Sequence, residues 1–280
     1  MKNIAAVLTC FNRREKTLTA LHALVVQSNL HSISISIFLT DDGSTDGTED
    51  AVRAEFPEVH LIRGTGQLFW NGGMRAAMAE AARTDPDYYL WLNDDTHLDP
   101  DAISRLLAIV DQLQDQAIVV GATRDPISGD LTYGGVNRAG WTQPVSFRLV
   151  PESKAAVSCD TMNGNCVLIP REIYNRTGPM SSAYSHAMGD MDYGLRARRC
   201  GFEVVVAPGT VGTCARNPGQ PKWRSTELTL STRLKAMQQR KGLPLQEWRA
   251  FTSAHAGPFW FIYWLWPYLR TAIAPQSKPQ

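Results

Sequence analysis

Two acidic turns carry the side chains of this sequence that are best suited to chemistry. Asn93-Asp94-Asp95-Thr96 follows the apolar run 88–92, and Asp41-Asp42-Gly43-Ser44 follows another β-rich run upstream. Adjacent carboxylates repel each other, and a hard divalent cation that also binds a phosphate-bearing ligand is a suitable partner for them. A solvated turn before the helix that begins near Asp99-Pro100-Asp101 is the alternative for the downstream pair.

These turns are positioned by alternating strand-like and helix-like segments. Apolar runs at 4–10, 33–40, 59–62, 88–92 and 118–122 alternate with helix-like stretches near 13–27, 45–55, 73–83 and 101–114. Repeated strand–helix–strand units favour a parallel sheet with helices on both faces, and such sheets bind ligands at the carboxyl ends of their strands. Thr9-Cys10-Phe11-Asn12, Asp41-Asp42 and Asp94-Asp95 all lie at such ends, so we expect them to converge in one cleft.

The second half of the sequence is less regular, and we expect it to continue the same sheet. Short β-like pieces lie near 145–150 and 165–169, and a strand is predicted at 204–206. A helical pattern runs from Gly189 to about Cys200, with Gly201 as its C-terminal cap. Beyond residue 221, the stretches 225–240 and 245–256 look helical. We place a domain boundary near residue 218, which separates residues 1–218 from a C-terminal extension of residues 219–280.

Composition narrows the class of protein. The chain has 280 residues and a net charge of +1, with 20% charged residues, so it has no general basic field and nucleic acid is not expected as a partner. Its five cysteines are odd in number and scattered, which favours reduced, buried thiols and a cytoplasmic location. No secretion signal precedes the first strand.

Aromatic residues are concentrated near the end of the chain, at 258–270. This run is shorter than the roughly 20 apolar residues that span a bilayer, and it is bounded by Pro258 and Pro267. An interfacial membrane anchor fits the tryptophans and tyrosines, helped by the upstream cations Lys235, Arg240, Lys241 and Arg249. Docking on the protein's own body or on a second subunit, which would make a homodimer, is an equal alternative.

Four motifs in sequence order resemble those of glycosyltransferase family 2. They are 9–13 (TCFNR), 40–48 (TDDGSTDGT), 93–95 (NDD) and 189–201 (GDMDYGLRARRCG). The resemblance covers roughly residues 4–215 and implies a GT-A fold, a nucleotide-sugar donor, a divalent metal and inversion at the anomeric centre. We therefore expect an α/β GT-A fold with a Rossmann-like, doubly wound and mostly parallel sheet, followed by a C-terminal helical extension.

The resemblance distributes roles over the acidic turns. A nucleoside diphosphate leaving group needs a cation held by few carboxylates, and Asp95 is our choice of ligand for Mg²⁺ or Mn²⁺. Asp94 is expected to face the ribose. Asp42 is expected to accept a hydrogen bond from a uracil or thymine imide, with Asp41 as the less favoured candidate. Ser44 or Thr45 would cap the following helix.

Further donor contacts are expected from three segments. Thr9, Phe11, Asn12 and Arg13 end the first strand-like run. The glycine-rich stretch 64–75 permits close backbone approach to a ligand, so Trp70 and Asn71 are expected in the donor pocket, with a tight core turn as the alternative. Arg224, next to Trp223, is expected to close over the pyrophosphate.

The last motif supplies the expected general base. Inverting transfer needs one group to take the proton from the acceptor hydroxyl, and Asp190 occupies the matching position. Asp192 is the second candidate for the base and an expected acceptor contact, although pairing with Arg196 one helical turn later is the alternative. Asn163 and His186 are also expected on the acceptor side.

The chain departs from the family pattern at two places. Gly189 replaces the glutamate that many relatives carry before the base. The stretch 209–217 lacks the histidine that completes the metal shell in many relatives. Either Asp95, phosphate oxygens and water suffice for the metal, or another residue such as His186 supplies a ligand.

Together these features predict an inverting, metal-dependent glycosyltransferase. It would move a sugar, with rhamnose as our choice, from a UDP- or dTDP-sugar to a glycan or polyprenyl-linked acceptor in bacterial surface polysaccharide synthesis. We expect it in the cytoplasm, with peripheral contact at the inner face of the membrane. A sugar nucleotidyltransferase and a catalytically degenerate sugar-nucleotide-binding protein are the alternatives.

Overall fold

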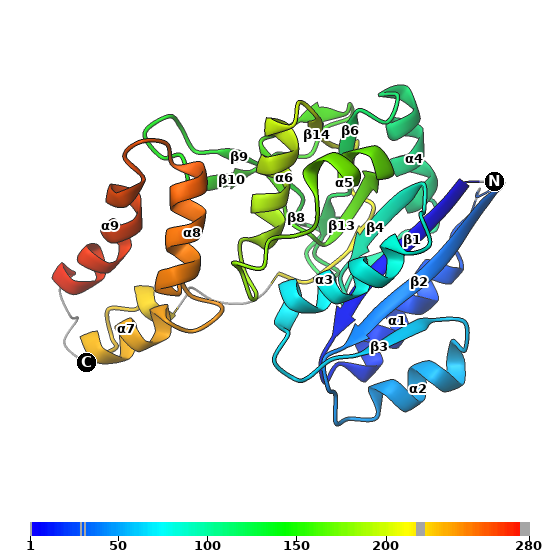
Figure 1. Ribbon diagram of the computed structural model, residues 1–280, viewed down its shortest axis with the longest axis horizontal. Coiled ribbons are helices and arrows are strands. Elements are labelled where there is room, and N and C mark those ends of the chain that lie inside the picture. Colours follow the sequence, from blue (N-terminus) through cyan, green and yellow to red (C-terminus); the bar gives the residue numbers. More distant parts are fainter. Residues whose placement is uncertain (1, 29, 31, 217–221, 275–280) are drawn as a thin grey trace.

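A central sheet of eight strands forms the body of the protein. The computed structural model describes residues 2–28, 30, 32–216 and 222–274 (Figure 1). Within them, the strands of this sheet are β1 (Lys2–Cys10), β2 (Ile33–Asp41), β3 (His60–Arg63), β4 (Tyr88–Leu92), β6 (Ala117–Val120), β11 (Val157–Ser158), β13 (Cys166–Pro170) and β14 (Glu203–Val206). Their order across the sheet is β11-β14-β6-β13-β4-β1-β2-β3.

Parallel pairing brings the ends of the first strands to one edge. β1 pairs with β2 along its whole length, from Lys2 opposite Ile33 to Cys10 opposite Asp41, and it also pairs in parallel with β4. β2 and β3 are parallel, as are β6 and β14, whereas β13 runs antiparallel to both β4 and β6. The expected mostly parallel sheet is therefore confirmed, and the turns after β1, β2 and β4 lie at the same edge.

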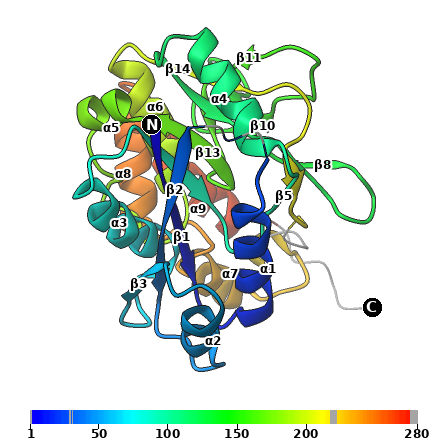
Figure 2. The same ribbon diagram turned by 90° about the vertical axis from the view of Figure 1, so that its right-hand side faces the viewer.

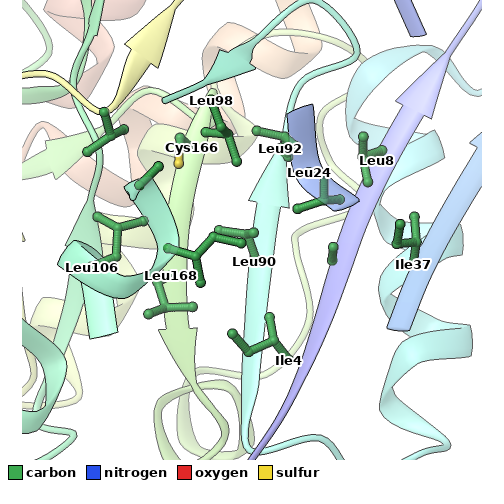
Figure 3. Close-up of a cluster of buried hydrophobic side chains, with 14 of the residues drawn as sticks. Ile4, Leu8, Leu24, Ile37, Leu90, Leu92, Leu98, Leu106, Cys166 and Leu168 are labelled. Atoms are coloured by element: carbon green, nitrogen blue, oxygen red, sulfur yellow. The ribbon is translucent and has the colours of Figure 1, made fainter. Parts of the chain in front are cut away.

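Helices cover both faces of this sheet, as Figure 2 shows. One face carries α1 (Arg14–Val25), α2 (Thr48–Glu55) and α4 (Ala102–Gln112), and the other carries α3 (Phe69–Ala82), α5 (Arg171–Thr177) and α6 (Gly189–Arg199). Successive residues of a strand point to opposite faces, so Leu8 packs against the first group of helices and Val7 against the second. Figure 3 shows the first core, where Leu24 and Leu106 meet Leu8, Leu90 and Leu168 of the strands.

Two smaller sheets account for the irregular second half. One contains β9 (Gly135–Arg138), β10 (Phe147–Leu149) and β12 (Thr161–Met162), and the other contains β5 (His97–Leu98), β7 (Thr123–Arg124), β8 (Leu131–Tyr133) and β15 (Gly212–Thr213). The expectation that the second half simply continues the main sheet is therefore only partly right. The piece near 145–150 pairs with β9 instead, because glycine and proline turns leave strands of two to four residues that pair locally.

The C-terminal extension is helical. It contains the 3₁₀ turn η1 (Lys222–Arg224) and the helices α7 (Leu230–Met237), α8 (Leu245–His255) and α9 (Trp260–Ile273), which lie to one side of the sheet in Figure 1. The helix expected over 225–240 is shorter, because Thr229 accepts a hydrogen bond from the Thr232 N–H and caps α7 there. The domain boundary expected near residue 218 lies outside the described residues.

A buried polar cluster joins α8 to α6. Asp192 Oδ1 lies 2.8 Å from His255 Nε2, and Asp192 Oδ2 accepts a hydrogen bond from Arg196 Nε at 2.8 Å. Burial alone would raise the pKa of Asp192, but the hydrogen bonds from His255 and Arg196 outweigh it and lower this pKa. Phe251 packs beside this cluster, with its ring 6.2 Å from that of Tyr184. Asp192 therefore connects the C-terminal helices to the body.

We predict that Asp192→Asn lowers the free energy of unfolding by about 3 kcal/mol, because it leaves Arg196 without its buried carboxylate. Urea unfolding followed by tryptophan fluorescence measures this. Since the pKa of Asp192 is lowered on folding, its contribution is present above the unfolded pKa of about 4 and is lost as the pH falls through the folded value. Glu80→Gln, which breaks the exposed pair of Glu80 with Arg83, is the control and should cost less than about 1 kcal/mol. Equal losses in the two variants would contradict the prediction.

Candidate active site

Arg13 bridges the acidic pair at the edge of the sheet. Its Nη1 atom lies 3.0 Å from Asp94 Oδ1 and 2.9 Å from Asp95 Oδ2. Arg13 follows the end of β1, and the two aspartates follow β4, so the pairing of these strands brings the three side chains together. Burial raises the pKa of Asp94 to about 6, against the opposing charge of Arg13. The pair is thus a partly desolvated anionic site with one positive partner already in place.

The second oxygen of Asp95 faces a thiol. Cys214, just after β15, places its Sγ atom 3.6 Å from Asp95 Oδ1, and Asn165 Nδ2 donates to this sulfur at 3.4 Å. Burial raises the pKa of Cys214 to about 12, so the protonated S–H donates toward the carboxylate. The sequence analysis missed this residue, although it lies in the stretch 209–217 that was searched for a histidine.

The acidic pair fits a metal that takes most of its ligands from elsewhere. Carboxylate oxygens are the donors that Mg²⁺ and Mn²⁺ prefer. Over residues 2–216 and 222–274, apart from positions 29 and 31, no group of three or more His, Cys, Asp or Glu side chains is arranged to hold a metal ion. A cation at Asp95 would therefore need phosphate or water oxygens to complete its coordination. His186 does not join the pair in a ligand cluster.

The upstream acidic turn is held by backbone N–H groups. Asp42 accepts hydrogen bonds from the N–H groups of Gly66 and Phe69, both at 2.8 Å. Asp41 Oδ1 accepts one from the Ser44 N–H, while Asp41 Oδ2 is buried with no hydrogen-bond partner among the described residues. Asn12 completes the turn, because its Oδ1 accepts from the Thr45 N–H at 2.7 Å. Asp42 thus fixes the glycine-rich turn, and Asp41 retains a free acceptor.

Trp70 connects the acidic pair to the last motif. Its Nε1 atom donates to Asn93 Oδ1 at 2.7 Å, directly before Asp94. The other end of the indole lies against Gly164, where a Cβ atom would come within 2.6 Å of the ring. Gly164 in turn donates its N–H to Asp190 Oδ2 at 3.0 Å. A continuous chain of contacts therefore links the acidic pair to the expected base.

Asp190 lies in the first turn of α6. Burial raises the pKa of its carboxyl group, although the N–H groups of Met191 and Gly164 oppose this. Gly189 before it packs against Asn71, and any Cβ atom there would collide with Asn71 Oδ1. The contact therefore requires glycine at this position. Asn163, the neighbour of Gly164, donates its backbone N–H to Gly134 O at 2.9 Å.

Three non-glycine residues with strained backbones lie around this site. Asn12, Phe69 and Met188 have φ angles of 51°, 57° and 71°. Such left-handed conformations are costly for side chains other than glycine and are often found at functional sites. Asn12 and Phe69 border the upstream acidic turn, and Met188 is the N-cap of α6. Backbone strain is therefore found both at the upstream acidic turn and at the start of α6.

Cations from the C-terminal extension reach the same region. The Arg240 guanidinium lies 3.6 Å from the centre of the Phe69 ring. Burial and the charge of Lys241 lower the pKa of His186 to about 4, and the charges of Arg13 and Arg240 add to this effect. The sequence analysis counted Arg240 and Lys241 among the cations that would help an interfacial anchor, one of its two equal alternatives for the aromatic run. The structure places Arg240 on Phe69 and both charges near His186. Their only sequence signal was the local Lys/Arg content.

Several expected ligand contacts have other partners. Thr9 is buried beneath Gly73 and donates to Thr40 O, whereas Phe11 is half exposed. Asn71 is fully buried and donates to the carbonyls of Ser181 and Tyr184, so it holds the loop before α6. Asp192 is occupied by His255 and Arg196, as described above. Arg224 stacks on Trp223 at 4.8 Å and lines a cavity beside α9.

The comparisons with known proteins follow this geometry. A family model described as "Glycosyltransferase like family 2" matches residues 2–241, which include both acidic turns, Asp190, Arg240 and Lys241. The chain belongs to this family. The glycosyltransferase family 2 membership expected from the four motifs is confirmed, and with it membership of a family of transferase enzymes.

Two curated relatives are similar to this family 2 chain. An N-acetylglucosaminyl-diphospho-decaprenol L-rhamnosyltransferase of Mycobacterium tuberculosis is 24% identical over 199 residues, which are 62% of this chain and 64% of the relative. The galactofuranosyltransferase GlfT2 of Mycolicibacterium smegmatis is 27% identical over 235 residues, which are 74% of this chain and 36% of that protein. The matched region thus spans less than two thirds of each relative.

A solved structure shows the same fold. The crystal structure of GalNAc-T7 with UDP, GalNAc and Mn²⁺ superposes with a TM-score of 0.58 at 12% identity, over 85% of this chain and 48% of the other. At that identity the likeness concerns the fold alone, and it confirms the expected GT-A fold. The roles of individual site residues stay predictions.

We predict that Gly164→Ala lowers the rate of UDP or dTDP release from a sugar nucleotide at least about tenfold. The added methyl group would lie 2.6 Å from the Trp70 ring and so displaces the indole, while Asp190 Cβ at 3.4 Å stays in van der Waals contact with it. We also expect a loss of about 1–3 kcal/mol in the free energy of unfolding. Gly140→Ala is the matched control, because its methyl group meets nothing within 4 Å. A full rate in Gly164→Ala would contradict the link between Trp70 and Asp190.

Proposed function

We propose that this chain is an inverting, metal-dependent glycosyltransferase of the hexosyltransferase type. It would transfer a sugar from a UDP- or dTDP-sugar to a glycan or lipid-linked acceptor in bacterial surface polysaccharide synthesis. The observation that supports this best is the chain of contacts from Asn93 through Trp70 and Gly164 to Asp190. It joins an anionic turn suited to a donor and a carboxylate suited to a base.

On the donor side, the proposal gives each acidic residue a partner. Asp95 would hold Mg²⁺ or Mn²⁺, and Asp94 would face the ribose. A bound divalent cation neutralises charge on the diphosphate and so favours its departure. Arg240 on Phe69 and Lys241 near His186 add positive charge at the border of the site, which suits a polyanionic leaving group.

The uracil or thymine ring would lie at the upstream turn. Both Asp42 oxygens already accept backbone hydrogen bonds, but a carboxylate offers about four acceptor positions. Asp41 Oδ2 next to it has no partner among the described residues. We therefore keep Asp42 as the proposed acceptor of the imide hydrogen bond. The unpartnered oxygen of Asp41 makes Asp41 a stronger second candidate for that role than the sequence alone did. Asn12, Thr9 and Phe11 border this side.

On the acceptor side, Asp190 would take the proton from the attacking hydroxyl. Its raised pKa makes it a better base than an exposed aspartate. His186 has a lowered pKa and would therefore be neutral at pH 7, so it can donate or accept a hydrogen bond without adding charge. Asn163 lies beside Gly164 and Asp190. These three side chains would position the acceptor hydroxyl.

The relatives support the choice of substrates. The name of one relative specifies a rhamnosyl transfer to a diphospho-decaprenol-linked sugar, and that of the other specifies galactofuranosyl transfer. The first name agrees with a lipid-linked acceptor. We retain rhamnose as the proposed sugar.

The donor proposal is tested with a panel of sugar nucleotides. We expect the protein to release nucleoside diphosphate from dTDP-rhamnose or from a UDP-sugar when Mn²⁺ or Mg²⁺ is present. Excess EDTA should reduce the rate at least about tenfold, because the diphosphate then departs without a cation. Coupled detection of the released UDP or dTDP measures the rate. Binding without release would favour a degenerate binding protein, and formation of a sugar nucleotide from a nucleoside triphosphate would favour a nucleotidyltransferase.

The base assignment is tested with Asp190→Asn. We expect transfer to fall by about a hundredfold or more, because the amide cannot accept the hydroxyl proton. The Kd of UDP or dTDP, measured by calorimetry, should change less than about twofold, since the hydrogen bonds of Asp190 go to the Gly164 and Met191 N–H groups and not to the acidic pair. Asp50→Asn on the exposed side of α2 is the control and should retain full activity. Loss of nucleotide binding in Asp190→Asn would overturn the assignment.

Helix α9 supports the proposed membrane contact. Ile262, Leu265, Trp266, Leu269 and Ile273 are exposed and follow helical spacing along one face, called here the α9 face. No acidic residue occurs from 257 to 280, and Arg270 lies on α9. Among the residues with described structure, no helix has the length and apolarity to cross a bilayer. We propose that the α9 face lies in the interface of an anionic membrane, at the inner side of the cytoplasmic membrane.

This contact predicts a defined loss of vesicle binding. Leu265→Glu together with Leu269→Glu should weaken binding to phosphatidylglycerol vesicles at least about tenfold. The reason is that two apolar side chains that would be buried in the membrane interface become charged. Co-sedimentation measures the bound fraction. Ile127→Glu, which charges an even more exposed apolar residue outside α9, should bind as the wild type does. The alternative is that the α9 face is a subunit interface. In that case the wild type would not bind the vesicles but would form a dimer, and the same double variant would be monomeric.

A further inference from the structure

Three arginines line one small cavity in the C-terminal extension. The cavity, here called the arginine cavity, has a volume of about 300 Å³ and lies between η1, α7 and α9. Arg224, Arg233 and Arg270 contribute to its wall, and among the described residues no carboxylate does. Within the part of the chain that the structure describes, none of the three forms an ion pair. Like charges brought together without a counter-ion repel one another, so the cavity favours an anion.

Arg233 is the clearest indication that the arginine cavity favours an anion. It is only 3% exposed, and its Nε atom donates to Trp223 O at 3.2 Å. Its Nη1 atom is buried and has no acceptor among the described residues. A buried charged donor without a partner is unfavourable, and an acceptor oxygen in the cavity would relieve this. Phosphate oxygens match the fork of guanidinium N–H groups well.

A larger aromatic cavity shares a wall with the first. It has a volume of about 690 Å³ and is lined by residues of η1, α8, α9 and the loop before β10. Trp223, Arg224 and Arg270 line both cavities. The larger one adds Trp248 and Trp266 among other apolar side chains. Charged and apolar binding surfaces are therefore adjacent.

The aromatic cavity also borders the α9 face. Ile262 and Trp266 line the cavity and are both among the exposed residues of that face. An apolar chain could therefore lie in the cavity and continue along α9. The opposite wall belongs to α8, where Glu247 accepts a hydrogen bond from the Ser185 hydroxyl at 2.7 Å, directly before His186. The aromatic cavity thus lies between α9 and α8, and α8 also contacts the residue next to His186.

We propose that the two cavities bind the phosphate or diphosphate ester of a long apolar alcohol. The phosphate groups would lie among Arg224, Arg233 and Arg270, and the first part of the hydrocarbon chain would lie against Trp248 and Trp266. This assigns Arg224 to the acceptor lipid and not to the donor pyrophosphate. The inference rests on the proposed function, and it specifies the acceptor as a lipid-linked diphosphate.

Farnesyl diphosphate is the probe, because it is soluble and carries both parts of the ligand. Its binding to the full chain is followed by calorimetry. Inorganic diphosphate and farnesol are titrated separately, and we expect farnesyl diphosphate to bind at least about tenfold more tightly than either, since only it fills both cavities. Phosphatidylglycerol in detergent micelles represents a membrane lipid as the alternative source of the same chemistry.

Arg224→Gln and Arg270→Gln are the test variants, because both side chains are exposed and their loss should not disturb folding. Each should weaken farnesyl diphosphate binding by about tenfold or more, as expected for a charge-assisted hydrogen bond. Lys235→Gln is the matched control: it removes one positive charge from an exposed position on α7 and lines neither cavity. It should leave the Kd unchanged.

The following outcomes decide the proposal. Tight binding that depends on Arg224 and Arg270 supports it. Equal binding of inorganic diphosphate, or equal effects of all three variants, overturns it. Tighter binding of phosphatidylglycerol than of farnesyl diphosphate overturns the acceptor assignment. If the wild type releases nucleoside diphosphate from sugar nucleotides but does not bind farnesyl diphosphate, this inference alone is overturned. If it binds farnesyl diphosphate but releases no nucleoside diphosphate, the inference is supported and the proposed use of a sugar-nucleotide donor is overturned.

Discussion

The neutralisation of two adjacent, partly buried carboxylates is the constraint on which the rest of the site depends. Asp94 and Asp95 follow a fully buried strand, and burial already raises the pKa of Asp94 to about 6. Arg13 meets this requirement in the free protein by contacting both side chains. It reaches them only because β1 and β4 are parallel neighbours whose turns meet at one edge. The same pairing, extended to β2, brings the upstream acidic turn alongside. The order of strands in the sheet thus determines which charges meet.

Close packing then transmits this arrangement to the acceptor side. Trp70 fits between Asn93 and Gly164 because Gly164 has no side chain, and Gly189 lets α6 begin against Asn71. The buried cluster around Asp192 fixes the other end of this region to α8, and with it the segment that carries Arg240 and Lys241. The C-terminal extension is therefore connected to the site in two ways: by the contact of His255 with Asp192, and by the cations Arg240 and Lys241 near Phe69 and His186. These contacts would hold the proposed lipid site, which lies in the C-terminal extension, in a fixed place relative to the donor and the base.

Local patterns in the sequence predicted the elements well, and long-range side-chain contacts poorly. The alternation of apolar runs predicted β1 to β4 and α1 to α4, because period and turn residues are local properties. The motifs predicted the acidic turns and the position of Asp190. The bridge from Arg13, the thiol of Cys214 beside Asp95 and the placement of Arg240 on Phe69 were not predictable, because each joins residues far apart in the chain. The start of α3 was placed four residues late for another reason: Phe69 adopts a positive φ that its side chain disfavours, and the site contacts compensate for it.

The dependence of metal binding on the nucleotide tests this view of the acidic pair most directly. In the free protein Arg13 occupies the pair, and the described residues offer no cluster of three ligands, so a cation should need phosphate oxygens from the donor. Electron paramagnetic resonance titration of Mn²⁺ with and without UDP or dTDP measures this. We expect the nucleotide to tighten Mn²⁺ binding at least about tenfold, and we expect Asp95→Asn to remove that gain. Mn²⁺ binding that is equally tight without nucleotide, or a gain that survives in Asp95→Asn, would contradict the assignment of Asp94 and Asp95 as the centre of the donor site.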